Sequence, residues 1–136
     1  MDREFGLKLK SIVDHGFSAN LASQSSFSVS SQVELNFELQ IHHDSESLEF
    51  IIHLRCYAAE SELVHYTSKV STEFQISDFS ERYQKETAIM DIPDESGVVM
   101  LSVAISHARA ITTKNLAGTV YFEQPFPLRQ SKRYLA

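Results

Sequence analysis

Three consecutive segments in the middle of the chain alternate apolar with polar residues, and this pattern constrains the fold more than any other feature. Successive side chains of a β-strand point to opposite faces of its sheet, so alternation predicts strands with one apolar and one polar face. Short polar turns separate the segments, which predicts an antiparallel meander. The apolar positions are Val33, Leu35, Phe37, Leu39 and Ile41 in the first segment, Leu48, Phe50, Ile52, Leu54 and Cys56 in the second, and Val64, Tyr66, Val70, Phe74 and Ile76 in the third.

A fourth strand is expected near the N-terminus. Segment 5–19 shows a broken alternation with one slip of phase, which predicts a strand that contains a β-bulge. The following residues, 20–31, include six serines and show little periodicity. We interpret them as a polar connector or as a weakly ordered extension of the first strand.

The apolar side of this sheet must be covered, because a large exposed apolar face would aggregate. Pro93 and Asp94 give a helix start signal, and the helical pattern ends near Asn115. We therefore predict an α+β fold: a four-stranded antiparallel meander sheet with one long C-terminal helix packed on it, in a single domain spanning residues 1–136. At 100° per residue, the stripe of the helix that suits packing on the sheet consists of Val98, Leu101, Ala104, Ile105, Ala108 and Ile111.

The same helix carries a second stripe of small and β-branched residues on its opposite side. A helix that is apolar on two sides must be buried on two sides, and a chain of 136 residues has no third layer to provide the second cover. This predicts a homo-oligomer formed through the helices. Two alternatives stay open: the valines are isolated surface residues, or the C-terminal tail covers them. The predicted interface residues are Val99, Val103, Ser106 and Ala110.

Charge and composition exclude several classes of function. The net charge is −6 and no basic cluster is longer than a pair, which argues against nucleic-acid binding. The N-terminus is charged where a signal peptide is apolar, and no run of residues approaches the roughly 18 apolar residues of a membrane span. The single cysteine, Cys56, excludes an internal disulfide and suits a reducing compartment. We expect a cytoplasmic protein with no direct membrane insertion.

The residues that could carry catalysis do not form a recognisable active site. His42 and His43 are adjacent on a strand and point to opposite faces, so we expect no metal site. Cys56 falls in an apolar phase, which is typical of a core residue, and the four glycines are too isolated for a phosphate-binding loop. His53 and His65 are predicted on the polar face. We expect no enzyme activity, no cofactor and no metal.

A rich supply of aromatic residues, nine Phe and five Tyr, favours a binding module for extended apolar chains. The order of several segments then resembles the SecB family of protein-export chaperones, especially its shorter SecB-like branch. No one of these segments is diagnostic alone, and together they cover about residues 5–128. They are "VDHGFSAN", "VELNFELQIHH", "LEFIIHLRCYAA", "STEFQISDF", "LSVAISHARAITTKNLAGT" and "FEQPFPL".

The resemblance implies an ATP-independent holdase that keeps unfolded polypeptide clients in long apolar grooves. It implies a dimer of dimers with the long helices between subunits, and possible delivery of clients to the SecA motor. Whether a dimer or a tetramer forms stays open. Some SecB-like members serve one antitoxin, so a dedicated-partner chaperone or scaffold is the alternative. A small hot-dog-type enzyme is less favoured, because there the main helix precedes most strands and here it follows all of them.

The resemblance also assigns candidate residues. Members that dock SecA use acidic residues of the exposed sheet face, where this chain has Glu34, Glu38, Glu49 and Glu73. SecB itself continues into a second helix after the proline-bearing loop, whereas this sequence has the basic segment "RQSKRYLA" there. The residues implied near the client groove are Phe17, Tyr57, Tyr66, Phe74, Ile76 and Phe79.

Overall fold

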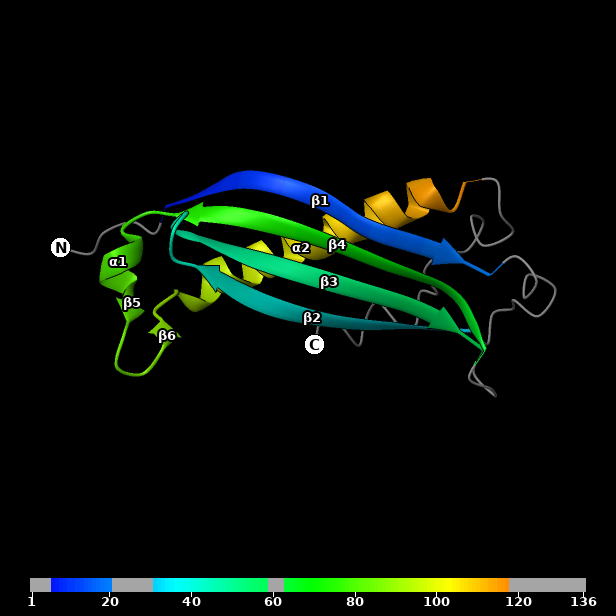
Figure 1. Ribbon diagram of the computed structural model, residues 1–136, viewed down its shortest axis with the longest axis horizontal. Helices are drawn as coiled ribbons and strands as arrows, with labels where there is room; N and C mark the ends of the chain where they lie inside the picture. Colours follow the sequence, from blue (N-terminus) through cyan, green and yellow to red (C-terminus); the bar gives the residue numbers. More distant parts are fainter. Residues whose placement is uncertain (1–5, 21–30, 59–62, 118–136) are drawn as a thin grey trace.

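Four long strands form one antiparallel sheet, and one long helix crosses one of its faces (Figure 1). The structure is a computed structural model that describes residues 6–20, 31–58 and 63–117. The order of the strands is β1-β4-β3-β2. The elements are β1 (Leu7–Ala19), β2 (Gln32–His42), β3 (Ser47–Tyr57), β4 (Val64–Ile76), α1 (Phe79–Arg82), β5 (Tyr83–Gln84), β6 (Ile89–Met90) and α2 (Asp94–Asn115).

The predicted fold class is confirmed. β2, β3 and β4 pair in sequence order through antiparallel neighbours, as the three alternating segments indicated. β1 pairs with the free side of β4, so the first two strands of the chain lie at opposite edges of the sheet. The helix bounds agree with the predicted start at Asp94 and end near Asn115. Segment 80–90, which lies between the last long strand and α2, contains most of α1 and the β5–β6 hairpin.

The bulge predicted in the first strand is confirmed. The β1–β4 register shifts between Leu9 and Ser11 and again between Asp14 and Gly16. Each shift inserts a residue that has no direct partner on β4, which bends the strand and changes the face to which the following side chains point. The phase slip in the sequence therefore marks a real irregularity of the edge strand.

α2 packs on the sheet through a row of residues spaced four apart. Ala104 and Ala108 are buried, and their small side chains let the helix approach β3 and β4 closely. Thr112 takes a buried place at the end of the row because its hydroxyl donates a hydrogen bond to Ser68 Oγ at 2.7 Å. The fourth member of the row is Met100, which is fully buried.

The predicted packing stripe of α2 is correct in its middle and wrong at its start. Ala104, Ile105 and Ala108 are buried, but Val98 is 64% exposed. Val98 precedes the fully buried Met100 by two residues, and two residues correspond to about 200° of helix rotation. Val98 therefore lies on the outer side of the helix. Leu101 and Ile111 lie at the margin of the contact and are partly buried.

Two single residues in the sheet show what alternation could and could not predict. Cys56 is fully buried as expected, and burial raises the pKa of its thiol to about 12, which keeps the thiol protonated at neutral pH. His65 was predicted to be a solvent-exposed residue of the polar face. This prediction was wrong, because its side chain is completely buried. Ser31, which directly precedes β2, is also buried, and Ser31 Oγ lies 3.3 Å from His65 Nε2.

Acidification should destabilise the fold through His65. Burial lowers the pKa of His65, so the folded protein holds a neutral imidazole while the unfolded chain takes up a proton near its ordinary pKa of about 6.5. The stability contributed by the neutral imidazole is present above this pH and is lost as the pH falls toward the lowered pKa. Urea unfolding at pH 7.5 and 5.5 should show a smaller fall in the free energy of unfolding for His65→Gln than for the wild type. The matched control, His53→Gln, changes an exposed imidazole, and an equal effect from both substitutions would contradict this role of burial.

Candidate functional site

The two faces of the sheet differ in chemistry, although the open face also carries the apolar residues Val13 and Ile51. The side chains that alternate toward α2 form the helix face, and those that alternate away from it form the open face. On β3 the helix face carries Leu48 to Cys56 at every second position, whereas Glu49, His53 and Arg55 lie on the open face. The cross-strand register extends this division to the other strands, because directly paired residues share a face.

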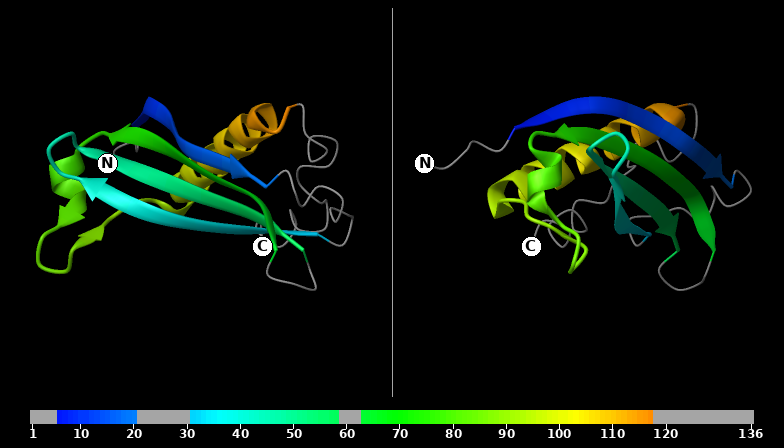
Figure 2. Two further views of the ribbon diagram at one scale, coloured as in Figure 1. Left: turned by 45° about the vertical axis from the view of Figure 1, so that its right-hand side comes forward. Right: turned by 60° about the vertical axis from the view of Figure 1, so that its left-hand side comes forward.

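α2 leaves apolar side chains of both edge strands exposed on the helix face. The helix runs diagonally across this face (Figure 2) and packs mainly on the two central strands. On β2, Phe37 is 50% and Leu39 is 42% exposed, and we call this pair the β2 row. The β1 row has three exposed members, which are Leu7 at 37%, Leu9 at 46% and Ile12 at 41%. Alternate apolar side chains on an edge strand offer contacts to an extended chain without demanding a particular sequence.

Four of the six residues predicted near a client groove lie in the hydrophobic core. They are 1–3% exposed, so in this conformation they contact the protein's own core rather than a ligand. Phe17 is half-buried on the helix face and stacks against one of them, Tyr66, with 6.4 Å between ring centroids. Tyr57 is half-buried on the open face, where its hydroxyl donates a hydrogen bond to Gln32 Oε1 at 3.1 Å. The other three core residues are Phe74, Ile76 and Phe79.

The six residues therefore do not share one site: four lie in the core, Phe17 lies on the helix face and Tyr57 lies on the open face. A client-binding role for any of them stays a prediction. The exposed rows on β1 and β2 were missed as candidates. Alternation shows which residues share a face, but it does not show which strands form the edges of the sheet. That information depends on the pairing of β1 with β4, which no local pattern in the sequence reveals.

The outer side of α2 is exposed and carries small and apolar side chains. Val99 is 53% exposed, and Ser106 and Ala110 are exposed as well. Val103 differs, because it is partly buried against the core. Val98, which was predicted to face the sheet, adds to this outer surface. Contact of these residues with a second subunit stays a prediction.

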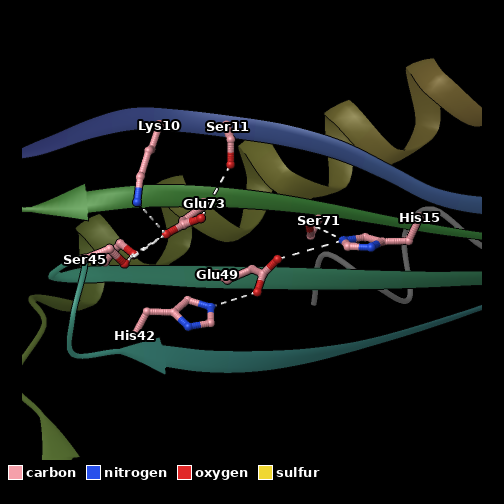
Figure 3. A network of polar contacts seen from close by, with 9 residues as sticks. Lys10, Ser11, His15, His42, Ser45, Glu49, Ser71 and Glu73 are labelled. Carbon is pink, nitrogen blue, oxygen red and sulfur yellow. Dashed lines mark hydrogen bonds and ion pairs between the residues drawn. The ribbon is translucent and has the colours of Figure 1, made fainter.

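A network of hydrogen bonds and ion pairs crosses the open face toward the end that carries the β2–β3 turn (Figure 3). Glu73 on β4 accepts hydrogen bonds from Ser47 and, at 3.3 Å, from Ser45, and it pairs with Lys10 Nζ at 3.3 Å. Its side chain is 17% exposed. The Ser47 hydroxyl and the Lys10 ammonium hold the pKa of Glu73 below its ordinary value, because both stabilise the carboxylate.

A second carboxylate, Glu49, lies directly opposite Glu73 on the neighbouring strand. Like charges at a direct cross-strand position destabilise a sheet unless cations offset them. Here the edge strands supply the partners: His42 Nε2 lies 2.8 Å from Glu49 Oε1, and His15 Nε2 lies 3.9 Å from Glu49 Oε2. His15 Nε2 also lies 2.7 Å from the Ser71 hydroxyl. The carboxylate and the hydroxyl approach the same ring nitrogen, which is not the arrangement of a Ser-His-acid triad.

All four glutamates predicted on the polar face lie there, and each has a basic partner. Glu34 pairs with Arg55 at 3.7 Å, and Glu38 pairs with His53 at 3.1 Å. The hydrogen bond from His53 is the main cause of the lowered pKa of Glu38. In the described strands the open face is therefore balanced in charge rather than acidic. Its lysines and arginine are Lys8, Lys10, Arg55 and Lys69.

Metal-ligating side chains do not converge in groups of three in the part of the chain that the structure describes. His42 and His43 are separated as expected, since His42 joins the open-face network while His43 packs against Tyr83 with 4.5 Å between ring centroids. Among the described helices, none is long and apolar enough to cross a membrane.

Comparison with known proteins does not assign the chain to a family. No protein-family model matches it. No curated protein matches it significantly. The structure supports the resemblance to SecB only at the level of the fold, which is a four-stranded antiparallel sheet with a long C-terminal helix packed on it.

The pKa of Glu73 should lie below the ordinary glutamate value of about 4.3, and Ser47→Ala should raise it. Because the folded pKa is lowered, Glu73 contributes stability above the ordinary value, and that stability is lost as the pH falls through the lowered pKa. Carbon-detected NMR titration of the side chain measures this directly. Lys10→Met should also raise the pKa, whereas Lys8→Met on the same strand should not. An ordinary pKa in the wild type would contradict the network.

Proposed function

We propose that this protein is an ATP-independent chaperone of the SecB-like type that holds non-native polypeptides in an extended form. The observation that carries this proposal is the pair of apolar rows on the edge strands. Phe37 and Leu39 on β2, and Leu7, Leu9 and Ile12 on β1, remain exposed beside the helix that covers the central strands. Isolated exposed apolar residues are common on protein surfaces, but rows along an edge strand form a continuous binding surface.

The position of the rows supports binding of an extended chain. Among the described strands, β1 pairs only with β4 and β2 pairs only with β3, so each row lies beside an outer strand edge. A polypeptide added to such an edge gains main-chain hydrogen bonds, which do not depend on its sequence. Its apolar side chains can pack against the row at every second position. Together these contacts suit clients that share exposed apolar segments rather than one motif.

The balanced charge of the open face favours the second candidate function, a chaperone for a dedicated partner such as an antitoxin. In the SecB family, delivery to SecA uses acidic residues of the exposed sheet face. Glu34, Glu38 and Glu49 lie on the corresponding face here, but each is already engaged at 3.7 Å or less, Glu34 by Arg55 and the other two by histidine rings. An acidic docking surface for SecA therefore has little support, while client holding on the helix face does not depend on it.

We further propose that the chaperone works in the cytoplasm as a homo-oligomer assembled through α2. The exposed small and apolar residues on the outer side of the helix supply a surface that a second copy can cover without burying charges. Close approach of two helices is easiest where side chains are small, as at Ser106 and Ala110.

The chaperone activity is tested by aggregation of a chemically unfolded client without nucleotide. The wild type should suppress aggregation, and a Phe37→Ser, Leu39→Ser double variant should require several-fold more protein for the same effect. Ile89→Ser is the matched control, because Ile89 is 56% exposed on β6 and belongs to neither row. Circular dichroism checks that each variant is folded. If the wild type has no effect in molar excess, the holdase function is wrong; if the double variant equals the control, the β2 row is not the site.

The assembly is tested by light scattering at micromolar concentration. The wild type should be larger than a monomer, and Val99→Glu should reduce its mass, because an interface that buries a carboxylate without a partner is strongly destabilised. Val99 suits this test better than Val103, since Val99 is exposed and Val103 contacts the core. Ile89→Glu is the matched control, because it adds the same charge at an apolar residue that is 56% exposed and lies on β6 instead of α2. A wild-type monomer, or an unchanged mass for Val99→Glu, would contradict assembly through this surface.

A further inference from the structure

The open face of the sheet is hollowed toward the end where β1 finishes and β2 begins. The hollow has a volume of about 610 Å³ and is lined by residues of all four long strands. It lies on the opposite face of the sheet from the apolar rows, so it is not explained by client holding. The lining side chains that matter for its chemistry are Lys69, Arg55, His15, His53, Thr67 and Glu34.

Lys69 is a cation at the centre of the sheet whose neighbours leave its charge uncompensated. Its direct cross-strand neighbours are Gly16 on β1 and His53 on β3. Lys10 and Arg55 on the same face have carboxylates within 4.0 Å, whereas in the described residues no carboxylate lies that close to the Lys69 ammonium. The charge of Lys69 acts on the Glu38 carboxylate over a longer distance and contributes to the lowered pKa of Glu38.

The bulge in β1 opens space beside Lys69. At Gly16 an added Cβ would meet nothing within 4 Å, so the chain leaves room where another residue would place a side chain. The register shift between Asp14 and Gly16 also directs His15 to the open face, where its ring nitrogen reaches the Ser71 hydroxyl. An irregularity of an edge strand next to a hollow is a common way to shape a binding site.

We propose that this hollow binds an anionic group, a phosphate or a carboxylate, through the Lys69 ammonium with the Arg55 guanidinium as the second cation. The Thr67 hydroxyl, which lines the hollow, adds a neutral hydrogen-bond donor. Charge-assisted hydrogen bonds of this kind are among the strongest that a surface site offers. Glu34 also lines the hollow and pairs with Arg55 at 3.7 Å, so a bound anion competes with Glu34 for the guanidinium and Lys69 is its primary contact.

Two probes distinguish the sources of the anion. Inorganic phosphate represents a small phosphate ligand, and an acetylated tri-glutamate peptide represents carboxylates of an acidic polypeptide. Each is titrated at constant ionic strength while backbone amides are followed by nitrogen–proton correlation NMR. We expect saturable shifts of Gly16, Thr67 and Lys69 with at least one probe. Binding of phosphate alone supports a small phosphate ligand, and binding of the peptide alone supports an acidic polypeptide.

Three variants test the assignment of residues. Lys69→Met should weaken binding by about tenfold, since it removes a charged hydrogen-bond donor. Lys8→Met removes the same charge from the same face, outside the hollow, and should leave binding unchanged. Gly16→Glu should abolish binding, because it places a carboxylate of the protein in the space beside Lys69.

The proposal is overturned by any of three results. The first is the absence of saturable shifts with both probes at tens of millimolar. The second is equal weakening by Lys69→Met and Lys8→Met, which would show attraction by overall charge instead of a site. The third is full binding by a folded Gly16→Glu variant. None of these results bears on client holding, which uses the other face of the sheet.

Discussion

The packing of one helix on a four-stranded sheet determines most of what this molecule exposes. Strands lie about 4.8 Å apart, and a helix with its side chains is about 10 Å wide, so a single helix covers about two strands. α2 covers β3 and β4 through the row that includes Ala104 and Ala108. The apolar side chains of β1 and β2 on the same face are then left at the flanks of the helix. Their exposure follows from the geometry of the two layers.

The open face obeys a different constraint. Glu49 and Glu73 lie opposite each other on the central strands, and each contacts a side chain of an edge strand: His42 hydrogen-bonds to Glu49, and Lys10 pairs with Glu73. This cross-sheet pairing ties the edges to the centre and balances the charge of the face. Lys69 has no carboxylate within 4.0 Å among the described residues, and its neighbour on β1 is a glycine, which offers no side chain to pair with it. The same sheet therefore presents apolar flanks on one side and a polar, locally cationic hollow on the other.

The sequence was sufficient to predict the four strands, the bulge, the helix bounds and the fold class, because each depends on local periodicity. It was insufficient wherever strand order or helix rotation decides exposure. Phe74 was assigned to the client groove through the resemblance to SecB, yet its strand lies in the centre of the sheet and the side chain is 2% exposed. Leu9 was passed over, and its place on the edge leaves it 46% exposed. Val98 was assigned to the packing stripe and is 64% exposed, whereas Met100 was not assigned to it and is fully buried, since a small rotation of the helix about its axis moves residues at the margin of the stripe.

Both candidate surfaces depend on one register of the sheet. Neighbouring residues of a strand point to opposite faces, so a slip of one position would carry Phe37 to the open face and Glu38 to the helix face. The ion pairs on the open face oppose such a slip, because each joins residues of different strands and would be broken by it. The pair between Glu38 and His53 fixes β2 on β3, and the contact between Lys10 and Glu73 fixes β1 on β4. Surface ion pairs of this kind add little free energy individually. Their contribution here is to specificity: they hold the edge strands in the one register that keeps apolar rows beside the helix and the cationic hollow on the other face.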